Sequence, residues 1–203
     1  MNKQVLWAAG LLLASALPLA AQEHRAEAKF SGTGTGQRSV RMDLGVGDYK
    51  IVPGGSDEVV VTWTGRTAAR SHAEVTVSGN EARVTTSGPH TGNNDVHFTI
   101  ELPQKSDIAA HISVGDASFG AFQGDEDISL TIGDLRIEVA DPDAFAEVTA
   151  STNIGDVSGG PFEATQKGFL GKTMHWTGPG HRRLKLHVGT GDVSISKASQ
   201  ATM

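Results

Sequence analysis

The chain has 203 residues, a net charge of −6 and no cysteine. An acidic chain with both signs of charge interspersed has no electrostatic attraction to nucleic acid or to an anionic membrane. Without cysteine it has no disulfides, no thiolate metal site and no lipoprotein anchor. Twenty-five glycines, few aromatic residues and many β-branched ones favour an all-β protein with many tight turns.

The first 21 residues have the organisation of a secretory signal peptide. Lys3 supplies a positive charge, an apolar run occupies residues 5–19, and Ala20-Ala21 precede the expected cleavage point. The run is short and interrupted, so we interpret residues 1–21 as a signal peptide rather than a membrane span. We therefore expect an exported protein, periplasmic, at the cell surface or extracellular, with no membrane span after cleavage.

Three segments follow the signal peptide. Residues 22–30 are polar and are predicted to be a mobile leader. Residues 31–197 carry the alternating apolar pattern of strands and are predicted to form one domain. Residues 198–203 are predicted to be a polar tail.

The predicted domain repeats one unit, in which two strands meet at a glycine-aspartate pair. Around Gly115-Asp116 the apolar residues Ile112 and Val114 have even numbers before the pair, and Ala117 and Phe119 have odd numbers after it. This change of parity predicts a corner between two half-buried strands, with the apolar face turned inward on both sides. Five such structural turns are predicted: Gly47-Asp48, Gly115-Asp116, Gly133-Asp134, Gly155-Asp156 and Gly191-Asp192.

The spacing of these corners predicts stacked coils. The corner glycines Gly115 and Gly133 are 18 residues apart. Gly155 follows Gly133 after 22 residues, and Gly191 follows Gly155 after 36. In addition, residues 34–52 align without a gap with residues 178–196, at an offset of 144, which is eight times 18. We therefore predict a single-domain β-solenoid (β-helix) whose consecutive coils, of about 18 to 22 residues, bury their apolar faces against one another.

Two other segments have local signals. Residues 74–77 and 82–85, separated by Ser78-Gly79-Asn80-Glu81, predict a hairpin around a tight turn. The segment from Asp141 to Ala146 predicts one short helical turn, with Asp141 as its cap and Pro142 at its first position.

Residues 102–139, followed by the segment ASTNIGDVSG at 150–159, contain a strand ending in Leu-Pro and then repeated units of strand, Gly-Asp and strand. In these features residues 34–196 resemble the bacterial putative-adhesin family, a domain of unknown function in secreted and envelope proteins. The resemblance implies a β-helix or β-solenoid fold and an envelope or extracellular location, and it brings no catalytic residues. The chain departs from the family pattern at Tyr49 and Ala117, where the family has valine after Gly-Asp.

The aspartates of the five corners have two interpretations. In the structural one, each carboxylate accepts hydrogen bonds from the backbone of its own turn while the glycine adopts a positive φ. In the other, stacked carboxylates form a calcium ladder. The most acidic segment, with Asp125, Glu126 and Asp127, is the candidate for a metal site. The tandem Gly-Gly-x-Gly-x-Asp motif of calcium-binding β-rolls is absent, and we predict no metal and no cofactor.

Ligand-binding candidates are few. Trp63 and Trp176 are candidates for sugar-stacking platforms, and they are equally suited to closing the two ends of a solenoid. For catalysis, Gly-x-Ser-x-Gly is absent. Asp134 with Arg136 is the local candidate for a carbohydrate-active enzyme.

These observations favour a non-enzymatic, adhesin-like interaction scaffold. Its partner is predicted to be an unidentified envelope protein or polysaccharide, without nucleic acid. The alternatives are a carbohydrate-active β-helix enzyme and a calcium-stabilised structural module. Comparing glycan binding with glycan cleavage would test the enzyme alternative. Comparing the melting temperature with and without calcium would test the calcium-stabilised module.

Overall fold

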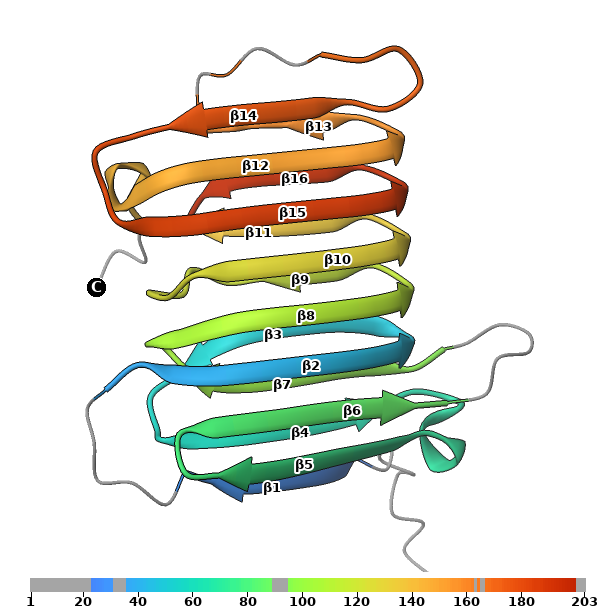
Figure 1. The fold of residues 1–203 in the computed structure, drawn as a ribbon. Coiled ribbons are helices and arrows are strands. Elements are labelled where there is room, and N and C mark those ends of the chain that lie inside the picture. Colours follow the sequence, from blue (N-terminus) through green and yellow to red (C-terminus); the bar gives the residue numbers. More distant parts are fainter. Residues whose placement is uncertain (1–22, 31–35, 89–94, 163, 165–166, 200–203) are drawn as a thin grey trace, which may run out of the picture.

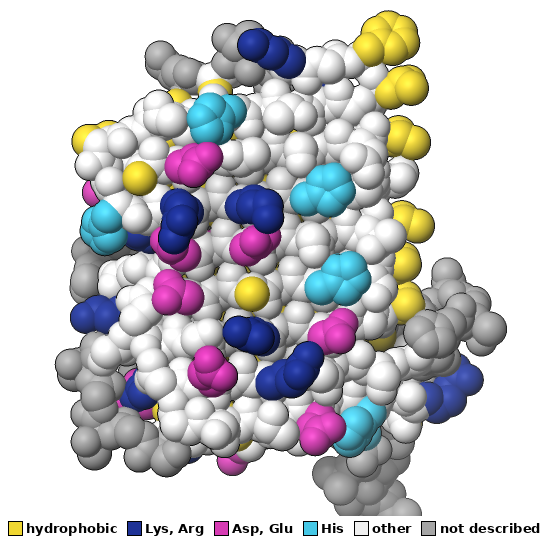
Figure 2. Space-filling model, viewed as in Figure 1, with side chains coloured by type: hydrophobic (Ala, Val, Ile, Leu, Met, Phe, Trp, Pro, Cys, Tyr) yellow, Lys and Arg dark blue, Asp and Glu magenta, His cyan; other side chains and the backbone are white. Residues whose placement is uncertain are grey.

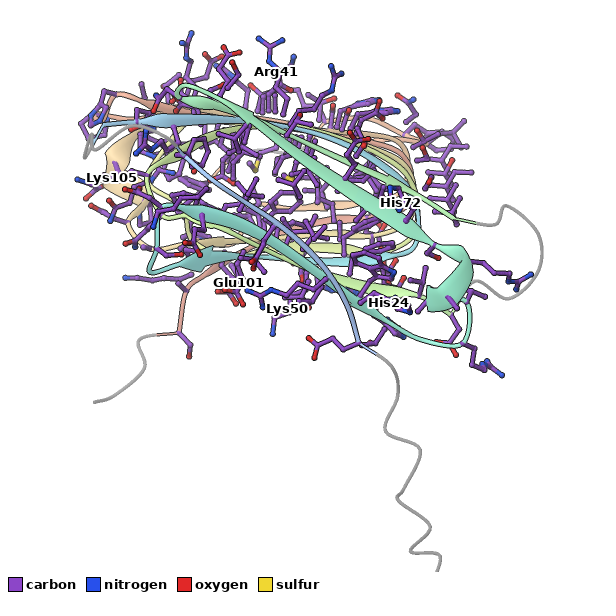
Figure 3. All side chains as sticks on the ribbon, turned by 90° about the horizontal axis from the view of Figure 1, so that it is seen from below. His24, Arg41, Lys50, His72, Glu101 and Lys105 are labelled. Carbon is purple, nitrogen blue, oxygen red and sulfur yellow. The ribbon has the colours of Figure 1, made fainter. Side chains whose placement is uncertain are left out.

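The computed structural model describes residues 23–30, 36–88, 95–162, 164 and 167–199, and the predicted signal peptide lies outside them. Within that part of the chain the fold is all-β, with two stacked eight-stranded sheets (Figure 1). Viewed along the stack, buried side chains fill the space between the sheets (Figure 3). None of the described helical segments has the length and hydropathy needed to cross a bilayer.

The order of the strands in each sheet differs from their order in the chain. From one end of the stack to the other, sheet A contains β1 (His24–Lys29), β4 (Glu58–Thr64), β7 (His97–Pro103), β3 (Asp48–Gly54), β9 (Ala117–Phe119), β11 (Leu135–Val139), β16 (Val193–Lys197) and β13 (Val157–Ser158). From the same end of the stack, sheet B contains β5 (His72–Ser78), β6 (Glu81–Ser87), β2 (Arg38–Val46), β8 (Ser106–Val114), β10 (Glu126–Ile132), β15 (Arg182–Thr190), β12 (Phe145–Ile154) and β14 (Thr173–Thr177). Two 3₁₀ turns cover Ala68–Arg70 and Pro142–Ala144.

Most strands of sheet B lead through a corner into a strand of sheet A, and we call each such pair a rung. Rungs β8–β9 and β10–β11 pair in parallel, with Ile112 opposite Leu130, so the 18-residue offset appears as strand register. Ile112, Ile128 and Leu130 are fully buried between the sheets. Alternating apolar residues thus form a continuous core, as the parity pattern predicts.

The rungs do not stack in chain order, which corrects one expectation. Rung β2–β3 lies between β7 and β9 in sheet A and between β6 and β8 in sheet B. Rung β15–β16 likewise lies between β10–β11 and β12–β13. The similar segments 34–52 and 178–196 therefore contribute strands three places apart, not eight coils apart. In each sheet, the strands of both rungs have a parallel neighbour on either side, whereas the antiparallel strands β1, β4, β5 and β14 lie toward the ends.

The polar segment 22–30 is also different from its prediction as a mobile leader. Its residues His24–Lys29 form β1, which pairs antiparallel with β4. The alternating Ala26 and Ala28 lie opposite Val61 and Val59, and Phe30 is buried in the core. A strand of small alternating residues covers the edge of β4 here, and an uncovered edge would leave backbone groups without partners.

The two local signals are confirmed. Strands β5 and β6 form an antiparallel hairpin, and Gly79 in its turn has a φ of +60°, which only glycine adopts readily. Asp141 caps the 3₁₀ turn Pro142–Ala144, because its side chain accepts a hydrogen bond of 3.1 Å from the Asp143 N–H.

The last apolar residue before a corner is not buried, contrary to the expected inward face. Val114, Ile132 and Ile154 are 36, 50 and 57% exposed. They have the parity of the core residues, but they lie where the chain leaves sheet B. The strand of sheet A begins only beyond the following Gly-Asp pair, so no opposing sheet covers them.

Candidate functional site

Five aspartates lie one above another along one edge of the stack, and we call them the aspartate ladder. Their spatial order is Asp48, Asp116, Asp134, Asp192 and Asp156. From the second onward, each backbone N–H donates to Oδ1 of the preceding aspartate, at 3.4, 3.0, 3.0 and 2.8 Å. The carboxylates therefore connect neighbouring corners, which replaces the expected hydrogen bonds within each corner's own turn.

The glycines of the corners permit this close stacking. Gly115 and Gly133 have φ values of +126° and +135°. A Cβ atom on Gly115 would lie 2.0 Å from the Gly47 carbonyl oxygen, and one on Gly133 would lie 2.1 Å from the Gly115 oxygen. Both the backbone conformation and the space thus require glycine at these positions.

Arg136 partly neutralises the middle of the aspartate ladder. Its guanidinium lies 3.9 Å from Asp116 and 3.6 Å from Asp134, and all three side chains are about half exposed. Asp134 and Arg136, the residues considered for catalysis, thus form an exposed ion pair that bridges two rungs. Such pairs contribute little to stability individually, and here the arginine reduces repulsion between stacked carboxylates.

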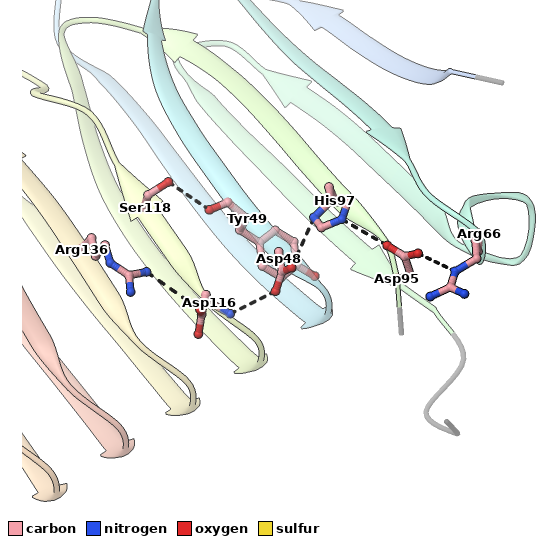
Figure 4. Close-up of polar contacts among 8 residues, drawn as sticks. All are labelled: Asp48, Tyr49, Arg66, Asp95, His97, Asp116, Ser118 and Arg136. Carbon is pink, nitrogen blue, oxygen red and sulfur yellow. Dashed lines mark hydrogen bonds and ion pairs between the residues drawn. The ribbon is translucent and has the colours of Figure 1, made fainter. Parts of the chain in front are cut away.

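The ladder continues at one end into a chain of charged groups (Figure 4). His97 Nδ1 lies 3.2 Å from Asp48 Oδ2, and His97 Nε2 lies 3.2 Å from Asp95 Oδ1. Arg66 Nε donates to Asp95 Oδ2 at 2.6 Å, and this hydrogen bond holds the pKa of Asp95 below its usual value. A carboxylate oxygen thus lies within 3.2 Å of each ring nitrogen of His97.

Metal binding finds little support in these groups. Oδ1 of four ladder aspartates is already a hydrogen-bond acceptor. Within the described ranges, no group of three or more histidine, aspartate and glutamate side chains is arranged to hold a metal ion.

The acidic candidates Asp125, Glu126 and Asp127 do not converge. Asp125 and Asp127 point outward, where they pair with Arg183 at 3.4 Å and Lys185 at 3.2 Å. Glu126 points into the core and is 3% exposed. Strand alternation places the middle carboxylate on the opposite face of sheet B, so the three cannot share one cation.

Glu126 belongs instead to a buried pair with Arg182. Arg182 Nη2 lies 3.5 Å from Glu126 Oε1, and the guanidinium also donates to the Gly124 carbonyl oxygen at 2.8 and 2.9 Å. The guanidinium lies 4.3 Å from the Phe145 ring centroid. Burial raises the pKa of Glu126 to about 8, an effect that the positive charge of Arg182 only partly offsets.

A groove of about 460 Å³ lies on the outer face of sheet B. Figure 2 shows positive and negative side chains interspersed across this face, and Figure 3 shows Arg41 pointing away from the core. The charged side chains that line the groove are Arg41, Asp107, Asp125, Asp127, Glu147, Arg183 and Lys185. The sequence patterns did not predict this groove. Aligning the outward positions of β2, β8, β10 and β15 by the corner glycines would have indicated it.

Trp63 and Trp176 lie toward opposite ends of the stack. Trp63 on β4 is 6% exposed, stacks between His24 at 5.4 Å and Phe98 at 6.1 Å, and donates to the Ala68 carbonyl oxygen. Trp176 on the terminal strand β14 is half-buried against Phe162, at 4.8 Å between ring centroids. These positions favour closure of the two ends over the binding of sugars on an open face.

Among solved structures, one is similar to this chain in fold. A putative cell adhesion protein from Clostridium sporogenes aligns over 88% of this chain and 100% of its own, with a TM-score of 0.58 and 14% identity. A putative adhesin from Bacteroides fragilis aligns over 88% and 98%, with a TM-score of 0.39 and 10% identity. No family model and no curated protein matches the chain.

Proposed function

We propose that this chain is an exported, non-enzymatic β-solenoid protein that acts as an adhesin-like interaction scaffold. The parallel rungs and their 18-residue register support the solenoid description, even though rungs β2–β3 and β15–β16 each lie out of chain order in the stack. The Clostridium sporogenes protein of similar fold is named a putative cell adhesion protein, which is consistent with this role.

The observation that carries the proposal is the charged groove on sheet B. Its side chains come from parallel strands in register, with Asp107, Asp125 and Arg183 in one column and Arg41, Asp127 and Lys185 in the next. Neighbouring strands are about 4.8 Å apart. A rigid grid of donors and acceptors at this spacing suits an extended polymer, and we propose an envelope polysaccharide as the ligand.

Binding suits this groove better than catalysis does. Asp125 and Asp127 are each paired with a cation across the strands, and the groove is open to solvent. Hydrolysis of a glycosidic bond requires one protonated and one ionised carboxyl on opposite sides of the bond. Asp125 and Asp127 both point outward from sheet B, so they would lie on the same side of a bound polymer, which does not fit this arrangement.

A glycan array of envelope polysaccharides, followed by titration of the best ligand, tests the proposal. Replacing both Arg41 and Lys185 by alanine is expected to weaken binding at least tenfold. Lys50→Ala, on the outer face of sheet A (Figure 3), is the matched control and should leave binding unchanged. Release of reducing ends that disappears in Asp134→Asn would instead establish an enzyme, and equal binding by the double variant would exclude this groove.

A further inference from the structure

The large hydrophobic side chains that the described residues leave exposed are concentrated at one edge of the stack. They are Val114, Ile132, Ile154, Phe169 and Leu170, of which the last two are 95 and 72% exposed. Figure 2 shows hydrophobic side chains in single file along the right-hand edge. Exposed apolar residues scattered over a surface need no explanation, but a contiguous row indicates an interaction site.

Backbone hydrogen bonds define this row, which we call the apolar column. Along the ladder, the N–H of each corner glycine donates to the carbonyl of the residue that precedes the next corner glycine in space. The acceptors are Val114, Ile132, Thr190 and Ile154, at 2.9 to 3.0 Å, and then Leu170, which accepts from Gly155 at 3.3 Å. With Val46 at the other end, six positions follow one another, and all except Thr190 are apolar.

The column is a ridge, and it ends in a short loop with a distinctive sequence. Phe169 and Leu170 are flanked by Gly168 and Gly171 and then by Lys167 and Lys172. Apolar side chains flanked by lysines are suited to a lipid interface, where the apolar groups enter the acyl boundary and the amines stay among the headgroups. With about 4.8 Å per strand, the six positions extend over roughly 24 Å.

The charged side chains beside the apolar column indicate which headgroup charge this edge would accept. The aspartate ladder lies two residues beyond the column. Its five carboxylates, together with Asp95 at its end, outnumber the cations Arg66, Arg136, Lys167 and Lys172 along this edge. The chain as a whole carries a charge of −6. Anionic headgroups would therefore be repelled, whereas zwitterionic headgroups present ammonium groups to the aspartates.

We propose that the apolar column and Phe169 dock this protein on the surface of a zwitterionic phospholipid bilayer. Binding at this edge is independent of the groove on sheet B and adds a second surface to the proposed function. A second copy of the chain fits the ridge less well, because two ridges in single file would bury far less than the roughly 1,000 Å² expected of a stable interface.

Flotation with phosphatidylcholine vesicles tests the proposal, using the exported protein with its N-terminus determined by mass spectrometry. Wild type is expected to float with the vesicles. The double variant Ile132→Ser, Ile154→Ser should bind about tenfold more weakly, since it removes two inserted side chains. Both residues are exposed, and an unchanged melting temperature would show that the fold is intact.

A gain-of-binding variant provides an independent measurement. Thr190→Ile completes the apolar column and is expected to strengthen vesicle binding several-fold. Thr177→Ile is the matched control, because Thr177 is exposed at the end of β14 near the opposite edge of sheet B. Equal strengthening by both variants would overturn the assignment to this edge.

The remaining outcomes are also decisive. Tighter binding to phosphatidylglycerol than to phosphatidylcholine vesicles would overturn the role of the aspartate ladder. Absence of wild-type flotation, together with a dimer in light scattering that the Ile132, Ile154 variant abolishes, would identify a second copy as the occupant. The Arg41, Lys185 variant should float normally, so failure of glycan binding and failure of lipid binding are distinguishable.

Discussion

Glu126 and Arg182 face each other inside the core, with 3.5 Å between Oε1 and Nη2. Arg182 belongs to the segment that repeats residues 34–52, and Arg38 is its counterpart there. Both arginines are buried and lie over an aromatic ring, Arg38 at 4.9 Å from the Phe30 centroid and Arg182 at 4.3 Å from that of Phe145. Both copies of the repeated segment thus place an arginine over an aromatic ring, at the first residue of a strand in sheet B.

The buried carboxyl of Glu126 predicts a pH dependence of stability. Its pKa is raised from 4.5 to about 8 in the folded protein, so the folded state binds the proton more tightly than the unfolded state. This contribution is fully present below pH 4.5 and is lost as the pH rises through 8. We expect the unfolding free energy of wild type to fall between about pH 5 and 9 more steeply than that of Glu126→Gln, measured by urea titration.

Asp127→Asn is the control for this experiment. Asp127 lies one residue away but is exposed and pairs with Lys185 at the surface. Its replacement should leave the slope of stability against pH as in wild type. Equal slopes in Glu126→Gln and wild type would show that Glu126 is ionised in the fold across this range, because it would then bind no proton in either state.

The corner glycines predict a large effect from a small substitution. Gly133→Ala places a methyl group 2.1 Å from the Gly115 oxygen at a φ of +135°. We expect a loss of about 3 kcal/mol in unfolding free energy, from backbone strain and displacement of the neighbouring corner. Gly55→Ala is the control, because no atom lies within 4 Å of its added Cβ and its φ is not positive. Equal stability of the two variants would contradict the close stacking of the corners.

Residue parity and spacing determine much of this fold from sequence. The alternation around Gly115 and Gly133 correctly predicts strands, corners and the register of β8 with β10, because one face of each strand must be buried. Chain order of the rungs is not predictable in this way, since β2 and β15 present equivalent apolar faces and fit any interior position. The exposure of Ile132 is not predictable either, because parity does not indicate where the opposing sheet begins.

The candidate site is less accessible to sequence reasoning. The segment Asp125 to Asp127 appears as one acidic cluster in the sequence, but strand alternation separates Glu126 from its neighbours. The groove on sheet B brings together Arg41 and Lys185, which are 144 residues apart. Only the sheet order reveals that proximity, and the repeat offset alone suggests a much larger separation.

The hydrogen bonds of the aspartate ladder predict different effects for two substitutions of Asp134. Asp134→Ala leaves the Asp192 N–H without its acceptor and should cost about 1 kcal/mol. Asp134→Asn keeps an acceptor oxygen. It removes one repelling charge and also the exposed ion pair with Arg136, which contributes little, so it should cost less than half as much. Chemical denaturation at low and high salt measures both effects. Equal losses for the two variants would mean that charge, rather than the backbone hydrogen bond, determines the contribution of this aspartate.

Trp63 distinguishes an end-closing role from a sugar platform. Its ring is 6% exposed and lies between His24 and Phe98, and its indole N–H donates to the Ala68 carbonyl at 3.2 Å. Trp63→Ala would leave a cavity between His24 and Phe98, so we expect a loss of about 3 kcal/mol in unfolding free energy. Trp63→Phe should recover most of that loss, since it restores the ring but not the hydrogen bond.

Glycan affinity measured below the melting temperature of both variants should match wild type, because the buried ring has no open face. A stable Trp63→Ala protein that fails to bind glycan would instead establish Trp63 as the sugar platform.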